Sequence, residues 1–264
     1  AKSTAARLSI IKNFSAKAWV PQTPALIEPL TGTAVSEHAE DFADELGISR
    51  KDQDMYAAHS YRKAFGAVKD IRKTVTPQLR TDKGDSTLIL IDLGEGKNRL
   101  GASCLAQVYS QLGDSPADVV SATRLKQFFN AMQALIEKGL VQAYHDRSDG
   151  GLFTTVAEMA FAGKTGVSIT LDTLTGNDVD VLFNEELGGV VQVLNQDIDA
   201  VNDLLTAFDI ADIAHVIGTV NSTDMIEFSR DGVAVLADSR VAMRTTWAQT
   251  TYEMQKRRDN PACA

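Results

Sequence analysis

The pattern of hydrophobic and polar positions divides the chain near residue 65. Before that point, apolar residues recur at helical spacing over 5–19 and 37–46, which predicts two helices. The loop between them, 20–33, holds three of the six prolines, and proline lacks the backbone donor that a helix requires. A capping pattern at 49–52 predicts a third helix, so we expect residues 1–64 to be mainly helical.

After residue 65, short apolar runs alternate with amphipathic stretches, which indicates an α/β or α+β domain over 65–264. The predicted strands are 87–92, 141–144, 166–171, 188–193, 216–220, 225–228 and 233–236. The predicted helices are 101–112, 122–138, one from about 152, 198–208 and a long closing helix over 238–256. The unbroken apolar run at 87–92 is typical of a strand that is covered on both faces.

A polar stretch at 145–151 follows a predicted strand and precedes a predicted helix, a position where open α/β sheets tend to bind ligands. Its carboxylates, Asp146 and Asp149, suit a hard cation such as Mg²⁺ that bridges to phosphate. The candidate phosphate donors at the start of the helix are Ser148, Gly150 and Gly151. The competing interpretation is a polar turn with an aspartate cap.

A glycine-rich loop at 94–101 also lies between a predicted strand and a predicted helix. Its glycine spacing matches neither of the standard phosphate-binding patterns. We therefore consider two interpretations, a nonstandard anion-binding loop that uses Lys97 and Arg99, and a plain glycine turn.

Other titratable residues are weaker candidates. Glu185 and Glu186 suit a metal site or a general base, but a solvated turn is the commoner meaning of such a pair. His145 is expected to make structural hydrogen bonds, because no second His or Cys lies at the spacing of a zinc site. Cys104 lies within an apolar helical pattern and is most simply a small core residue. No catalytic residue is assigned.

Composition narrows the classes of function. The net charge of −9 argues against a broad nucleic-acid surface, since phosphate neutralisation requires clustered Lys and Arg. The sequence has no apolar run long enough for a membrane span and no signal-peptide pattern, so we expect a cytoplasmic protein. Its two cysteines support neither a disulfide framework nor a thiolate metal site.

Several motifs after residue 65 closely resemble the carboxyl-terminal synthetase part of the large, single-chain phosphoribosylformylglycinamidine synthases of purine biosynthesis. They are KDIRKTVTPQ at 69–78, LGASCLAQ at 100–107, HDRSDGGL at 145–152, AEMAFAG at 157–163, LFNEELGG at 182–189 and RDNPACA at 258–264. The resemblance implies an aminoimidazole-ribonucleotide-synthetase-like carboxyl domain. It also implies an ATP-dependent amidoligase in which the substrate amide is activated as an iminophosphate and attacked by ammonia from glutamine.

By position in the motif, the resemblance makes Asp146 a magnesium ligand and Ser148 a nucleotide contact, with Mg²⁺ and ATP or ADP as cofactors. The preceding synthetase domain and the following glutaminase domain of the parent enzyme lie outside the matched motifs, and both are implied partners. We therefore expect residues 65–264 to contribute part of a Mg²⁺-nucleotide site and to be inactive alone.

Residues 1–64 do not resemble that synthase; they resemble the loop region of a thiolase of fatty-acid β-oxidation. The motifs are PQTPA at 21–25, EPLTG at 28–32, EHAE at 37–40, GISRKDQD at 47–54 and AHSYRKA at 58–64. They include no catalytic motif of a thiolase. The chain thus resembles a fusion of two incomplete pieces that leaves a sheet edge unpaired. The alternative function is a non-catalytic chimeric binding or structural module, with a thiolase-derived segment for acyl-CoA or oligomer contacts.

Overall fold

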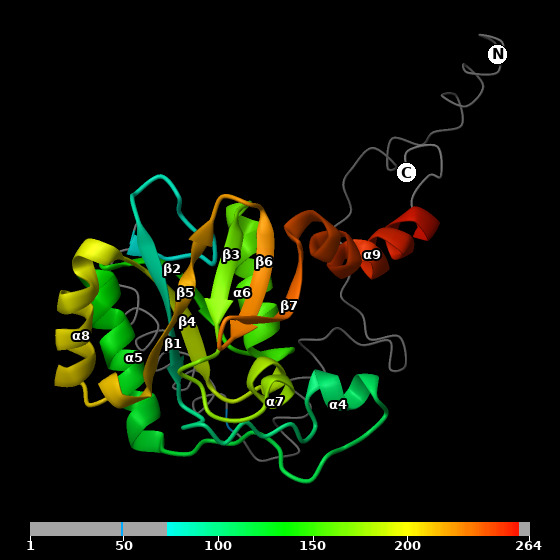
Figure 1. Cartoon of the computed structure of the whole chain (residues 1–264). Coiled ribbons are helices and arrows are strands. Elements are labelled where there is room, and N and C mark those ends of the chain that lie inside the picture. The colour runs from blue at the N-terminus through cyan, green and yellow to red at the C-terminus, as the bar shows by residue number, and fades with distance from the viewer. Residues whose placement is uncertain (1–48, 50–72, 259–264) are drawn as a thin grey trace. The chain divides into compact units, whose positions relative to one another are not determined.

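The chain divides into two compact units, Ala1–Ala67 and Val68–Ala264. The computed structural model describes Ser49 and residues 73–258, so the predictions for 1–64 and for the sheet edge at the junction lie outside the described residues, apart from Ser49. In the second unit, the described residues form one mixed sheet covered by helices (Figure 1). None of the helices in these residues is long and apolar enough to cross a membrane.

The sheet has seven strands in the order β2-β4-β1-β5-β3-β6-β7. Their bounds are β1 Ser86–Asp92, β2 Val141–Asp146, β3 Gly166–Thr170, β4 Gly188–Leu194, β5 Ala214–Asn221, β6 Met225–Arg230 and β7 Val233–Ser239. Neighbouring strands are antiparallel, except that β3 and β6 are parallel. All seven were predicted from the apolar runs.

Helices cover both faces of the sheet (Figure 1). Helices α5 (Ala122–Glu137) and α8 (Ile198–Ala207) pack on one face, and α6 (Gly151–Gly163) packs on the other. The remaining elements are α4 (Cys104–Val108), α7 (Asp178–Phe183), α9 (Arg240–Arg258) and two 3₁₀ turns, η3 (Asn195–Asp197) and η4 (Ala211–Ile213). The described unit therefore has three layers.

Strand β1 lies at the centre of this packing and is buried along its whole length. Leu88 and Leu90 belong to the core beneath α6, whereas Ile89 and Ile91 belong to the core beneath α5 and α8. Successive side chains of a strand point to opposite faces, so a strand with helices on both sides must be apolar at every position. Continuous apolar strands are common in parallel sheets, but β1 is antiparallel to both of its neighbours. The helices on both faces of the sheet therefore explain the apolar run of β1.

Strands β1 and β2 run in the same direction because each pairs antiparallel with β4, which lies between them. Asp92, the last residue of β1, is opposite Gly188, and Asp146, the last residue of β2, is opposite Gly189. The carboxyl ends of β1 and β2 and the amino end of β4 therefore meet at one edge of the sheet. We call this the site edge.

Two predicted elements differ from the structure. The helix expected over 101–112 is only α4, because Ser110 adopts a left-handed conformation (φ 54°) and ends it. Its amide donates to the carbonyl of Gln107, and the amide of Gln111 donates to that of Ala106, the pattern of a Schellman cap. Helix α7 was not predicted, since it is too short for helical periodicity to show.

Candidate functional site

Three loops meet at the site edge. They are the β1–α4 loop (93–103), the β2–α6 loop (147–150) and the α7–β4 loop (184–187). Each follows or precedes a buried element that fixes its ends, and charged side chains join the loops to one another. The site edge is therefore held by polar contacts between segments far apart in the sequence.

Arg147 is the central connection between these loops, and only 4% of its surface is exposed. One terminal nitrogen of its guanidinium lies 2.5 Å from Oδ1 of Asp92 and donates to the carbonyl of Leu187. Its Nε donates to the carbonyl of Glu186 at 2.7 Å. Asp92 in turn accepts hydrogen bonds from the amides of Gly94 and Gly96. The sequence analysis gave no role to Arg147 or Asp92.

Arg99, which is partly buried, and Glu186 form a second connection between the loops. Nε and a terminal nitrogen of Arg99 donate to the two carboxylate oxygens of Glu186, at 2.6 and 2.7 Å. The hydrogen bond with Glu186 raises the pKa of Arg99. Glu186 is fully buried, so the prediction of a solvated turn is wrong for it. The structure pairs Arg99 with a carboxylate of the protein, whereas Lys97 of the same loop is exposed.

Asp146, the predicted metal ligand, is exposed at the end of β2. Its Oδ1 accepts the hydroxyl of Tyr144, and within the described residues its Oδ2 has no hydrogen bond. Burial of Tyr144 raises the pKa of that hydroxyl, and the hydrogen bond to Asp146 raises it further. The hydroxyl is therefore a donor at neutral pH, which orients the carboxylate and leaves its second oxygen for a cation.

The predicted phosphate donors lie in the turn that begins α6. Gly150 (φ 79°) and Gly151 (φ 67°) are both in the left-handed region that favours glycine. The amide of Gly150 donates to Oε1 of Glu185 at 2.8 Å, and the amide of Gly151 donates to the carbonyl of Ser148 at 2.9 Å. Ser148 itself is exposed. Both amides thus have protein acceptors, and the Ser148 hydroxyl has no partner among the described residues.

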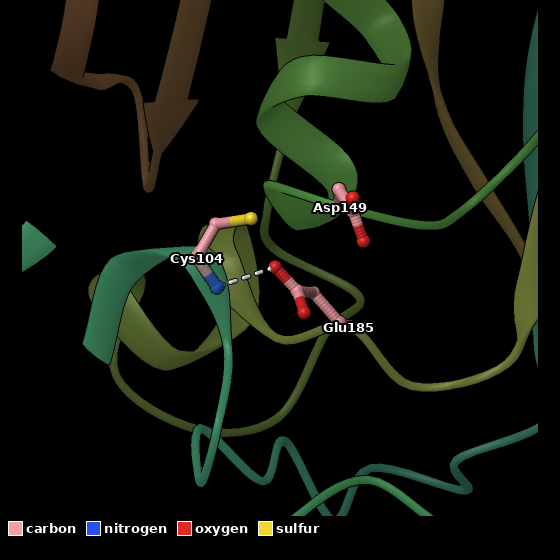
Figure 2. A group of neighbouring side chains, drawn as sticks. All are labelled: Cys104, Asp149 and Glu185. Atoms are coloured by element: carbon pink, nitrogen blue, oxygen red, sulfur yellow. Dashed lines mark hydrogen bonds between the residues drawn. The ribbon is translucent and has the colours of Figure 1, made fainter. Parts of the chain in front are cut away.

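Cys104 at the start of α4, Asp149 and Glu185 lie close together (Figure 2), with one potential metal-ligand atom from each lying within 4.8 Å of the others. Oε1 of Glu185 accepts the amide of Cys104 at 2.8 Å. Cys104 is half-buried on the short helix α4, so the prediction that it is a core residue is wrong. Burial raises the pKa of its thiol, and the carboxylates of Glu185 and Asp149 raise it further.

His145 makes the structural hydrogen bonds expected of it. Its Nδ1 lies 2.7 Å from the carbonyl of Asp146, and its Nε2 lies 2.9 Å from Oε2 of Glu158 on α6. The other oxygen of Glu158 accepts Nε1 of Trp247 on α9 at 3.1 Å. These contacts connect the end of β2 through α6 to the last helix.

Two hollows border the site edge. A groove of about 650 Å³ runs along α5, and Asp146 is its one acidic lining residue among those described. Its other walls are mostly apolar and are formed by Ala122, Leu125, Lys126, Phe128, Phe129, Met132, Gln133, Ile136 and Tyr144. A smaller, polar hollow of about 250 Å³ is lined by Asp92 and Arg147. Ser148, Gly150 and Gly151 line neither of them.

The donor set at Asp146 fits a magnesium ion that keeps most of its waters, because such an ion needs only one or two protein carboxylates and completes its shell with phosphate. The sequence analysis proposed Asp146 because it sits in a polar motif at a strand end. The sequence analysis did not identify Arg147 or Asp92. A charged residue at the end of an apolar strand, as in Ile91-Asp92, is a signal that could have identified Asp92.

Residues 84–230 match the family model described as AIR synthase related protein, C-terminal domain. This match covers more than half of the chain and includes every strand except β7 in full.

Solved structures of PurL from Thermotoga maritima are similar in fold. The PurLQS structure has 15% identity and a TM-score of 0.51, over 65% of this chain and 27% of that chain. PurL complexed with FGAR has 14% identity and a TM-score of 0.52, over 66% and 30%. PurL complexed with ATP has 16% identity and a TM-score of 0.50, over 65% and 27%. The chain thus spans under a third of the length of these proteins.

Proposed function

The chain belongs to the family of AIR synthase related proteins, through their C-terminal domain, and on that premise we propose that its site edge supplies one wall of a Mg²⁺-nucleotide site. The observation that carries the proposal is that Asp146 lines the mostly apolar groove along α5. A nucleotide combines a flat, largely apolar base with a phosphate tail that binds Mg²⁺. A groove lined by aromatic residues and one carboxylate matches both parts.

Phe129 and Asp146, which both line the groove, have separate roles in this proposal. Phe129 is half exposed on the groove, so its ring is available to contact a base. Asp146 would hold Mg²⁺ through the carboxylate oxygen that Tyr144 leaves free. Ser148 would contact phosphate through its hydroxyl, whereas the amides of Gly150 and Gly151 would first exchange their protein acceptors, Glu185 and the carbonyl of Ser148, for phosphate oxygens.

Thermal unfolding with MgATP or MgADP tests this proposal. A ligand that binds only the folded state at 100 times its Kd stabilises it by about 2.7 kcal/mol, which corresponds to roughly 5–10 °C for a domain of this size. We expect that shift for the wild type and a much smaller one for Asp146→Asn. Asp82→Asn, an exposed carboxylate remote in sequence, is the control and should keep the shift. An equal shift in Asp146→Asn would refute the role of Asp146.

The reaction we propose for this site is the ATP-dependent conversion of formylglycinamide ribonucleotide to formylglycinamidine ribonucleotide. Its support is the motif resemblance and the fold shared with PurL. Because the chain spans 27% of the PurLQS structure, we expect no ammonia-dependent ATP turnover by this chain alone. Turnover with formylglycinamide ribonucleotide that Asp146→Asn abolishes would show the chain to be sufficient.

A further inference from the structure

We propose that Cys104, Asp149 and Glu185 form a binding site for a borderline-soft divalent cation of the Zn²⁺ class, separate from the Mg²⁺-nucleotide site at Asp146. One potential ligand atom from each side chain lies within 4.8 Å of the others, and the three come from the start of α4, the β2–α6 loop and the α7–β4 loop (Figure 2). This proposal does not rest on nucleotide binding.

The charge of the cluster favours a cation. Two carboxylates and a thiol face one another, and among residues 73–258 no lysine, arginine or histidine forms an ion pair with Asp149 or Glu185. By contrast, the two buried carboxylates at the site edge each have a guanidinium partner, Asp92 with Arg147 and Glu186 with Arg99. The repulsion between Asp149 and Glu185 is therefore left for an ion to offset.

The backbone holds the ligands close to the distances that such an ion needs. Oε1 of Glu185 accepts the amides of Cys104 and Gly150, both at 2.8 Å, and so joins the start of α4 to the β2–α6 loop, which carry the other ligands. Tetrahedral Zn²⁺ with bonds of about 2.0–2.3 Å places its ligand atoms roughly 3.6 Å apart. Closing the cluster from 4.8 Å or less thus requires side-chain movements of about 1 Å.

The sulfur selects the class of cation. Mg²⁺ and Ca²⁺ prefer oxygen ligands, whereas Zn²⁺ and Cd²⁺ accept a thiolate together with carboxylates. On binding, the S–H bond of Cys104 breaks, its proton leaves to solvent and a sulfur–metal bond forms. Three anionic ligands then surround a doubly charged ion, and a water completes four-coordination. Burial and the two carboxylates keep the free thiol protonated at neutral pH, so binding releases a proton.

Cadmium titration of the full chain tests the site, because a cadmium–thiolate bond has a charge-transfer absorption in the ultraviolet that oxygen ligands do not produce. We expect this band in the wild type and in Cys263→Ser, which removes the only other cysteine of the sequence. We expect no band in Cys104→Ser. A band that survives Cys104→Ser, or no band in the wild type at a tenfold excess of Cd²⁺, would overturn the proposal.

Competition with a chromophoric zinc chelator gives a second measurement. Asp149→Asn removes a charge from an exposed residue without a hydrogen-bond partner among those described, so folding should be unaffected. We expect it to weaken Zn²⁺ binding at least tenfold while the cadmium–thiolate band persists at higher Cd²⁺ concentration. Unchanged Zn²⁺ affinity in Asp149→Asn would exclude the carboxylate as a ligand. Asp82→Asn, which changes an exposed carboxylate in the segment before β1, is the control and should bind Zn²⁺ like the wild type.

Discussion

The guanidinium of Arg147 lies 2.5 Å from the carboxylate of Asp92, and both side chains are almost completely buried. This contact joins the loop after β2 to the end of β1, although the two residues are 55 positions apart. Because Arg147 also donates to the carbonyls of Glu186 and Leu187, one side chain connects all three loops of the site edge. The candidate site depends on that connection.

Arg147→Met should therefore be strongly destabilising. It leaves the carboxylate of Asp92 buried without a charged partner, and loss of one member of a buried pair costs about 3–5 kcal/mol. Urea unfolding measures the change. The exposed pair Arg80–Asp82 provides the control, since Arg80→Met should have little or no effect on the midpoint. Similar midpoints for the two variants would contradict a central role for Arg147.

Arg99→Ala should affect stability more than anion binding. The substitution leaves the fully buried Glu186 without its cation, and we expect a loss of about 3 kcal/mol in the free energy of unfolding. Lys97→Ala, which changes an exposed neighbour in the same loop, should leave stability unchanged. If Arg99→Ala instead kept wild-type stability and weakened nucleotide binding, the loop would be an anion-binding loop.

Gly151→Ala should lower the stability of the folded state more than an ordinary glycine substitution at positive φ does. An added Cβ would lie 2.6 Å from the carbonyl oxygen of Asn184 and 2.7 Å from that of Leu182, and backbone atoms cannot move away easily. At Gly139 (φ 72°) an added Cβ meets nothing within 4 Å, so Gly139→Ala reports only the conformational cost of about 1 kcal/mol. Thermal unfolding measures both variants, and we expect the melting temperature of Gly151→Ala to be well below that of Gly139→Ala.

Alkylation of Cys104 should be slow near neutral pH. Its thiol pKa is raised above the ordinary value, so the thiolate that reacts with iodoacetamide is scarcer than for a free cysteine, and the rate should keep rising as the pH passes the ordinary thiol pKa. The measurement uses Cys263→Ser and mass spectrometry. Glu185→Gln should speed the reaction, since it removes a neighbouring charge that raises this pKa. Equal rates would show that Glu185 has no such influence.

Much of the fold follows from local sequence patterns. The apolar run of β1 and the amphipathic pattern of α5 predicted these elements to within a residue or two, since burial depends on side-chain periodicity along each element. The short helices were less predictable. Helix α4 ends where Ser110 turns left-handed, and α7 is shorter than two helical turns, so neither depends on a periodic pattern.

The sequence by itself determined the strands, the main helices and the polar motif at Asp146, because these depend on residues close together in the chain. Only the tertiary structure decided which charges are paired. Arg147 with Asp92 and Arg99 with Glu186 are partners 55 and 87 positions apart, brought together because β1 and β2 flank β4 and end at the same edge. Strand order is a property of the folded sheet and cannot be read from local sequence patterns. Only the tertiary structure therefore shows that Cys104, Asp149 and Glu185 lie close together.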